Sequence, residues 1–226
     1  MTLDQALQKI HRAYEQNVDY PESGEDDYNL RVGLIGDAVE TWGTTENINW
    51  RELYQPLSTA STGDKTTTAS DAVYDMPTDF VRLATTVTIN GIKYEFVKPE
   101  NVKHTIDNVL KTHFYYITGT PTAYKLNVYP TPTETGLAIE YMYYKQPTRP
   151  TTGTDIIPMS MPDFVVYMTL ARLYEGDTND SKTVFYEQKA KGLLDQMIIA
   201  NELPPANEPL SMGDTAYELQ GSAFGR

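Results

Sequence analysis

The sequence predicts an α+β fold: a helical bundle with an inserted antiparallel β domain, a small sandwich or barrel, and an extended C-terminal tail. Helical periodicity concentrates near the two ends of the chain, and short strand-like segments fill its middle. Charge divides in the same way, because residues 1–57 carry 11 acidic and 4 basic side chains, residues 155–226 carry 11 and 5, and residues 58–154 carry nine of each. We therefore expect residues 1–57 and 155–200 to form one discontinuous bundle, residues 58–154 the β domain, and residues 201–226 the tail.

Two amphipathic helices are expected in the first part of the chain. Thr2 and Gln5 fit a capping box ahead of apolar residues at helical spacing over residues 3–16. An acidic run at residues 25–27 suits the positive end of a second helix, which we expect to end near Gly43.

The chain changes character after these helices. Residues 50–54 predict a short third helix, which Pro56 closes. Residues 58–71 are rich in Ser and Thr and poor in large apolar side chains, so they predict a loop and mark the best candidate domain boundary.

The middle of the chain predicts strands separated by turns. Asn90-Gly91, between residues 80–90 and 92–97, is the strongest hairpin signal. Residues 99–111 begin with proline and carry apolar residues at helical spacing, which predicts a small helix on the sheet. No long crossover helix separates the strands, so we expect an antiparallel sheet. The other strands are expected at residues 73–77, 113–118, 124–129 and 137–144.

Residues 161–200 carry the strongest helical signal, which predicts two antiparallel helices around a polar turn at residues 176–181. The faces that we expect to be buried hold Phe164, Met168, Ala171 and Tyr174 in the first helix, and Tyr186, Ala190, Leu193, Leu194 and Met197 in the second. Such a hairpin cannot bury its apolar face alone. We expect it to close the bundle that residues 3–54 open, after a linker of residues 145–159 that contains three prolines.

Composition excludes several classes of protein. The chain has no cysteine, hence no disulfide, no thiol nucleophile and no zinc–thiolate site. A net charge of −13 argues against a protein that grips nucleic-acid phosphates. The first residues lack the layout of a signal peptide, and no apolar run reaches transmembrane length, so we expect a soluble, unexported chain without a membrane partner.

Two segments resemble ligand-binding loops but depart from them. Residues 177–181 resemble the first half of a calcium loop, yet Lys182 stands where glycine is needed and Gln188 where a bidentate glutamate is needed, which favours helix capping. Residues 63–66 resemble a phosphate loop, but the glycine that should precede the lysine is absent, which favours a turn.

The sequence contains no convincing catalytic set. The three histidines, His11, His104 and His113, have no second metal ligand at a suitable spacing. The densest acidic run, residues 25–27, is explained by a solvated helix start, and no serine lies in a nucleophile elbow. We therefore expect no catalytic residue, no cofactor and no metal, and hence no enzyme.

A run of aromatic residues at 141–144 invites a sugar-binding or base-stacking interpretation. Alternation places Tyr141 and Tyr143 on one face of a strand, and Met142 and Tyr144 on the other. Packing within a sheet explains this pattern better, and base stacking is disfavoured further because basic residues are not interleaved.

Three segments together resemble a known family. Residues 74–80, YDMPTDF, enter a strand; residues 139–147, IEYMYYKQP, leave the sheet; and residues 161–175 continue from MPDF into LARLYE. Their order and spacing, over roughly residues 72–200, resemble those of the tail tubular protein A-like head-to-tail adaptor, or connector, proteins of tailed bacteriophages.

The resemblance implies a structural virion protein located in the neck and, during assembly, in the host cytoplasm. It implies a homo-oligomeric ring of twelve copies that binds the portal protein on one side and a tail, nozzle or tail-completion protein on the other. Genomic DNA would pass through the ring, and an acidic lumen would avoid binding its phosphates. In such a ring we expect residues 201–226 to dock on the portal, and the outer face of the hairpin at residues 161–200 to contact a neighbouring subunit or the portal.

Two alternatives remain open. The first is a tail-side or baseplate-type protein that binds host glycan through exposed tyrosines of its β domain. The second is an enzyme, which the absence of a catalytic set disfavours.

Overall fold

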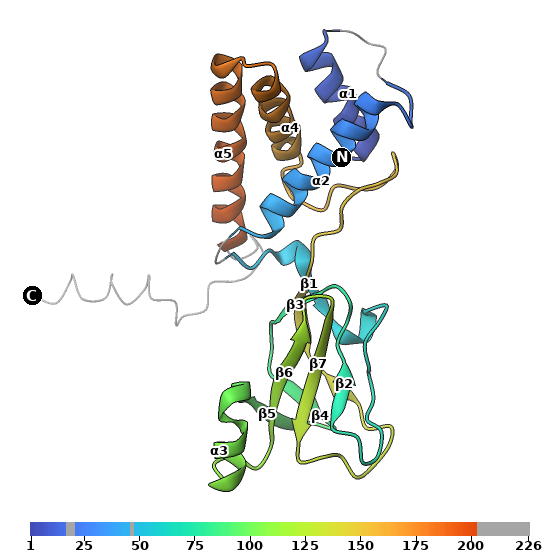
Figure 1. The fold of residues 1–226 in the computed structure, drawn as a ribbon, viewed down its shortest axis with the longest axis vertical. Helices are drawn as coiled ribbons and strands as arrows, with labels where there is room; N and C mark the ends of the chain where they lie inside the picture. The colour runs from blue at the N-terminus through green and yellow to red at the C-terminus, as the bar shows by residue number, and fades with distance from the viewer. Residues whose placement is uncertain (17–20, 46–47, 203–226) are drawn as a thin grey trace, which may run out of the picture.

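We describe a computed structural model of the chain, covering residues 1–16, 21–45 and 48–202. Its helices and strands separate into two bodies stacked end to end (Figure 1). The helical body contains helices α1, α2, α4 and α5, and the β body contains strands β1 to β9 and helix α3. The predicted α+β class is confirmed. The predicted tail lies, from residue 203 onwards, outside the described residues.

Helix α1 (Leu3–Tyr14) begins with the predicted capping box. Gln5 N donates to Thr2 Oγ1 at 3.3 Å, and Thr2 N donates to Gln5 Oε1 at 3.0 Å. The same end is held by the segment that follows the β body, because Leu3 N donates to the carbonyl oxygen of Asp155 at 2.9 Å. Helix α2 (Asp26–Gly43) follows, with the predicted acidic residues at its start.

Helix α4 (Asp163–Gly176) lies at the centre of the helical body. It packs against α1, against α2 and along α5 (Asp180–Glu202), with which it forms the predicted antiparallel hairpin (Figure 1). Its buried residues face several directions rather than one stripe, as expected of a helix surrounded by others. These are Phe164, Val165, Val166, Thr169, Leu170, Ala171, Leu173 and Tyr174.

A buried cation lies between α1 and α2. Arg31 is buried, and its Nη1 lies 2.6 Å from Nδ1 of His11, while its Nη2 donates to Glu15 Oε1 at 3.0 Å. Because Arg31 donates to Nδ1, that nitrogen must carry its lone pair. The contact therefore fixes the neutral tautomer of His11 with its proton on Nε2.

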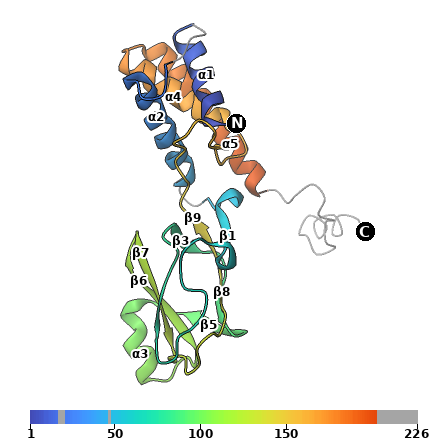
Figure 2. The same cartoon turned by 90° about the vertical axis from the view of Figure 1, so that its right-hand side faces the viewer.

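The β body has its own apolar core, separate from that of the helical body. Its strands form a three-stranded sheet in the order β1-β9-β3 and a six-stranded sheet in the order β2-β7-β6-β5-β4-β8. The smaller sheet lies next to the helices (Figure 2). The strands are β1 (Tyr54–Pro56), β2 (Val73–Asp75), β3 (Phe80–Leu83), β4 (Val87–Ile89), β5 (Ile92–Phe96), β6 (Phe114–Thr120), β7 (Ala123–Tyr129), β8 (Ile139–Glu140) and β9 (Met142–Lys145), with α3 (Val102–Asp107) between β5 and β6.

One strand pair departs from the predicted antiparallel arrangement. Strands β5 and β6 are parallel, with Glu95 opposite Phe114 and Phe96 opposite Tyr115. A parallel pair needs a crossover connection, and residues 97–113 supply one through α3. The small helix was predicted, but its role as a crossover was not.

Three predicted elements are divided differently in the structure. Residues 50–54 form a 3-10 turn (Arg51–Leu53) followed by β1, rather than a helix. Residues 80–90 form β3 and β4 in different sheets, because Ala84 N and Thr85 N both donate to the carbonyl oxygen of Met142 and the chain bends there. Residues 137–144 break at Tyr141, whose carbonyl oxygen accepts from Leu57 N at 3.0 Å.

The predicted hairpin turn at Asn90-Gly91 is confirmed. Both residues have positive φ, 49° and 77°, as a two-residue hairpin turn requires, and Ile89 pairs with Ile92 across it.

Thr169 offers a test of how tightly α4 is enclosed. It is fully buried, and its Oγ1 has no hydrogen-bond partner among the described residues. Replacing it by valine removes a buried, unpaired hydroxyl, so Thr169→Val should raise the free energy of unfolding by about 1 kcal/mol in urea titrations. Thr183→Val is the control, because Thr183 Oγ1 donates to the carbonyl oxygen of Asn179 at 3.1 Å and its loss should lower stability. A loss of stability in both variants would contradict the enclosure of α4.

Candidate functional site

The candidate catalytic and metal-binding residues are not brought together. His11 faces Arg31 inside the helical body, His104 lies on α3, and the ring of His113 packs against Tyr94 with centroids 5.3 Å apart. Across residues 1–16, 21–45 and 48–202, no group of three or more His, Cys, Asp or Glu side chains is placed to hold a metal ion.

The two loop-like motifs have structural partners instead. Asp177 Oδ2 accepts a hydrogen bond of 2.5 Å from the hydroxyl of Tyr14, and this bond, with burial second, raises the pKa of Tyr14 to about 12. Asn179 Oδ1 accepts from Lys182 N at 3.3 Å, at the start of α5. In residues 63–66, Lys65 Nζ donates to the carbonyl oxygen of Ala60 at 2.8 Å.

The tyrosine-rich strand packs into the core of the β body. Tyr141 and Tyr143 are buried, whereas Met142 between them is 39% exposed, as the alternation predicted. Burial raises the pKa of both tyrosines, and the hydroxyl of Tyr143 donates to Asp79 Oδ1 at 3.0 Å. These two rings are therefore not available to stack on a sugar or a base.

A groove of about 620 Å³ opens on the β body beside this strand. Polar side chains on its wall include Lys65, Thr85, Thr88 and Glu140, and Met142 contributes an apolar surface. The sequence did not single out this groove.

A polar clamp holds the segment leaving the β body against α2. Arg149 Nε donates to Glu40 Oε1 at 2.6 Å, and Arg149 Nη2 donates to Glu40 Oε2 at 2.7 Å and to Asp37 Oδ1 at 2.8 Å. This bidentate pairing lowers the pKa of Glu40. The clamp joins residues that are separated by 109 and 112 positions in the sequence, so no local pattern could have predicted it.

Close packing reinforces the junction between the two bodies. A Cβ added to Gly43 would lie 2.4 Å from Cγ of Pro147, so the chain requires glycine there. On α5, Asn201 Nδ2 donates to the carbonyl oxygen of Asn49 at 2.9 Å, and Arg51 N donates to Asn201 Oδ1 at 3.1 Å. Helix α2 is thus fastened to the segment that leaves the β body, and α5 to the segment that enters β1.

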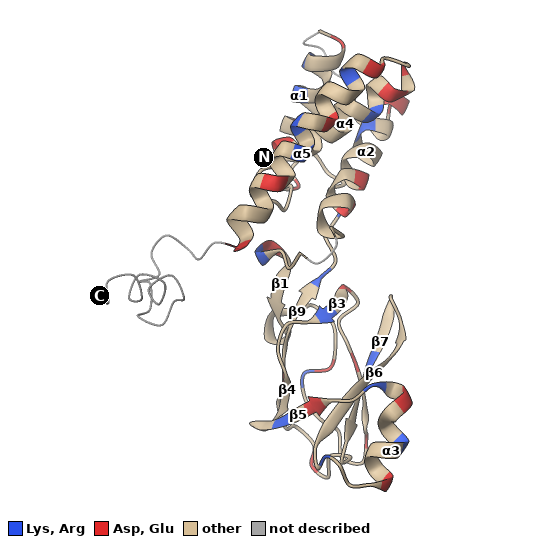
Figure 3. Cartoon of the chain, turned by 90° about the vertical axis from the view of Figure 1, so that its left-hand side faces the viewer, with Lys and Arg blue, Asp and Glu red and all other residues tan. Residues whose placement is uncertain are grey.

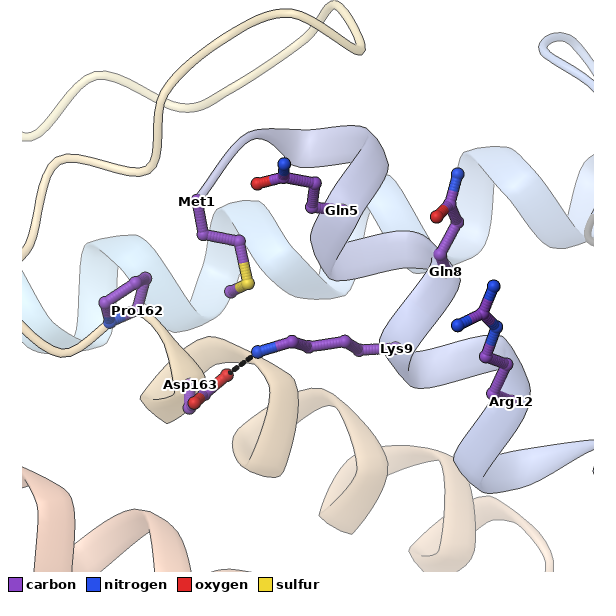
Figure 4. Close-up of a pocket in the computed structure, with 7 residues that line it drawn as sticks. All are labelled: Met1, Gln5, Gln8, Lys9, Arg12, Pro162 and Asp163. Carbon is purple, nitrogen blue, oxygen red and sulfur yellow. Dashed lines mark hydrogen bonds and ion pairs between the residues drawn. The ribbon is translucent and has the colours of Figure 1, made fainter.

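A shallow groove of about 320 Å³ lies between α1 and the start of α4 (Figure 4). Lys9 extends across it to Asp163, with Nζ 2.6 Å from Oδ1, and Gln5, Gln8 and Arg12 lie along the α1 side. Among the described residues, Arg12 makes no ion pair, so this face of α1 carries an exposed positive charge.

Helix α5 leaves a wide surface uncovered. Only Ala190 and Met197 of its 23 residues are buried, and its apolar side chains are not confined to the side that packs on α4. In Figure 3 the ribbon is coloured at acidic and basic residues, and both kinds of residue lie along α2, α4 and α5. We define the α5 outer face as the exposed residues Val184, Phe185, Gln188, Gly192, Asp195 and Ile199, and the α2 outer face as Asp26, Leu30, Gly33, Asp37 and Thr41.

Within the described residues, no helix is both long enough and apolar enough to cross a membrane.

Comparison with known proteins gives one family match. The family model described as SU10 adaptor protein matches residues 1–212, and so covers both the helical and the β body. No curated protein matches the chain.

The rigidity of the junction can be tested with one methyl group. Gly43→Ala places that methyl against Pro147, and we expect a loss of about 1–3 kcal/mol in unfolding free energy, measured by thermal and urea unfolding of the isolated chain. The matched control is Gly192→Ala, where a Cβ meets no atom within 4 Å and alanine should stabilise α5. Equal stability of Gly43→Ala and the unaltered chain would show that the junction is loose.

Proposed function

This chain belongs to the SU10 adaptor protein family, a family of phage head–tail adaptors, and we propose that it forms a ring between the portal and the tail. The match over residues 1–212 is the observation that carries the proposal, because it includes both bodies and the junction between them. A structural role in the virion neck follows from the family. A closer kinship with tail tubular protein A-like adaptors stays a prediction.

The shape of the chain supports a role as a spacer. The two bodies have separate cores and are stacked along one long axis (Figure 1), and the Arg149 clamp and the Gly43–Pro147 contact stiffen their junction. Stiff, elongated subunits can hold two assemblies at a fixed distance from each other. We propose that the ring contains twelve copies, with the portal on one side and a tail or nozzle protein on the other.

Charge supports the passage of DNA through the ring. The chain has a net charge of −13, which opposes binding of DNA phosphates through counterion release. A lumen that repels phosphate lets DNA slide without being held. Genomic DNA is therefore proposed as a transient, non-specific partner rather than a bound ligand.

The proposed domain limits follow the charge division and the linker composition. We propose residues 1–57 with 155–200 as the helical domain, residues 58–154 as the inserted domain, and residues 201–226 as a segment that docks on the portal. At these limits the structure differs in detail, because β1 (Tyr54–Pro56) pairs with β9 of the β body and α5 extends to Glu202. No enzymatic step, cofactor or metal has a place in this proposal, and assembly would occur in the host cytoplasm.

Glycan binding through the β body is the second candidate. This candidate requires exposed tyrosines on the sheet, and it is weakened because Tyr141 and Tyr143 are buried. The groove that contains Thr85, Thr88 and Glu140 is the surface that remains for a sugar. Binding on a glycan array that is lost on Glu140→Gln would favour this candidate.

The ring can be sought directly. We expect mass photometry of the chain mixed with the portal protein of the same phage to show about twelve chain masses, each 25.5 kDa, added to the portal. Negative-stain images of the same sample should show a ring coaxial with the portal. Failure to bind either the portal or any tail component, under every salt condition tried, would overturn the proposal.

Removal of the final segment separates docking from folding. A chain that ends at Glu202 keeps both apolar cores and the Asn201 contacts at the junction, so its melting temperature should equal that of the full chain. Its binding to the portal should be lost. A large fall in melting temperature would show instead that residues 203–226 contribute to the folded core.

A further inference from the structure

The turn between β4 and β5 contains Asn90-Gly91, the only Asn-Gly pair in the sequence. Both residues are exposed, and a Cβ added to Gly91 would meet no atom within 4 Å. Among the described residues, the side-chain amide of Asn90 and the backbone N–H of Gly91 have no hydrogen-bond partner. No contact within the described chain therefore shields either group from reaction.

Asparagine is a thermolabile residue, and its side-chain amide is lost without an enzyme when the next backbone nitrogen attacks it. Here the nitrogen of Gly91 attacks Cγ of Asn90, and a C–N bond forms between them. The side-chain nitrogen leaves as ammonia and carries away the proton of the Gly91 N–H. Glycine favours this attack because it has no Cβ beside its nitrogen.

The product of the attack is a five-membered succinimide ring, which one water molecule opens. Opening at one carbonyl carbon gives aspartate at position 90. Opening at the other gives isoaspartate, in which the main chain runs through the former side chain and is one methylene longer. Nothing is oxidised or reduced, and water is the only co-reactant.

The conformation of the turn holds the reacting atoms apart. Asn90 has a φ of 49° and lies in the left-handed region, where ψ is typically about +47°. With such a ψ the nitrogen of the next residue points away from Cβ, whereas ring closure needs both on the same side. The turn must therefore open before the reaction occurs. Local opening of an exposed loop costs much less free energy than global unfolding.

The two products differ in what they do to the sheet. Aspartate before glycine suits a two-residue hairpin turn as well as asparagine does. Isoaspartate lengthens a turn whose ends are fixed by the pairing of Ile89 with Ile92. It also displaces the backbone N–H of Asn90, which donates to the carbonyl oxygen of Ala138 at 3.0 Å. Strand β4 lies between β5 and β8, so a shift at the turn disturbs the pairing on both sides.

We propose that Asn90-Gly91 is a site of spontaneous deamidation that is gated by opening of the β4–β5 turn. The isoaspartyl product destabilises the β body, and the aspartyl product does not. The buried side chains at stake are Ile89 and Ile139, which are 2% and 3% exposed on β4 and β8. This inference concerns the chain itself and does not depend on the proposed ring.

Two other asparagines serve as internal controls. Asn127 is 8% exposed, and its Nδ2 donates to Thr118 Oγ1 at 2.8 Å. Asn179 Oδ1 accepts from Lys182 N at 3.3 Å. Neither residue precedes glycine, so both should keep their amides while Asn90 loses its own.

Peptide mass spectrometry measures the reaction in the full chain. The protein is aged in mildly alkaline buffer, digested with trypsin, and assayed for amide-to-acid conversion in the peptide of residues 83–93. We expect conversion at Asn90 at least tenfold faster than at Asn127 or Asn179, and faster still in urea that unfolds the chain. Conversion no faster than at the controls would overturn the site. Equal rates at Asn90 in the folded and unfolded chain would overturn the gating.

Thermal unfolding separates the two products. Freshly prepared Asn90→Asp has the aspartyl side chain with a normal backbone, so it should melt at the same temperature as the unaltered chain. The isoaspartyl fraction of the aged protein, identified by an isoaspartyl methyltransferase assay, should melt at least about 2 °C lower. Equal melting temperatures for that fraction and Asn90→Asp would contradict the proposed damage to the β body. So would a fall in the melting temperature of Asn90→Asp as large as that of the aged fraction.

Discussion

The burial of α4 is the constraint on which the rest of the structure depends. This helix carries apolar side chains on nearly all sides, and removing them from water requires neighbours on several sides at once. Two of these neighbours, α1 and α2, precede the β body in the chain, and the third, α5, follows α4 directly. The chain must therefore leave the helical body and return to it, and the strands form a second core during that excursion.

The two cores are joined by few but specific contacts. Arg149 forms ion pairs with two carboxylates of α2, and Gly43 leaves room for Pro147 to pack against α2. Asn201 links α5 by hydrogen bonds to the segment entering β1. Exposed ion pairs contribute little to stability individually, so the bidentate geometry and the tight packing matter more than the charge. The result is a body in which α4 is surrounded while α5, packed on one side only, faces outward.

Local features of this fold could be predicted from sequence, and long-range pairings could not. The capping box at Thr2, the Asn90-Gly91 turn and the α4–α5 hairpin depend on residues close together in the chain. The parallel pairing of β5 with β6 depends on how residues 97–113 cross the sheet. The clamp of Arg149 on α2 was missed for the same reason. The exposure of Phe185 agrees with the sequence analysis, because this residue falls outside the predicted buried stripe of α5.

Hydrogen–deuterium exchange by mass spectrometry, on the chain alone and bound in the portal complex, tests most directly the claim that the helical body carries assembly. The account predicts that amides of α2 and α5 exchange more slowly in the complex. Amides of α4, enclosed already, and of the six-stranded sheet should exchange at the same rate in both samples. New protection confined to the β body, with α2 and α5 unchanged, would contradict the account.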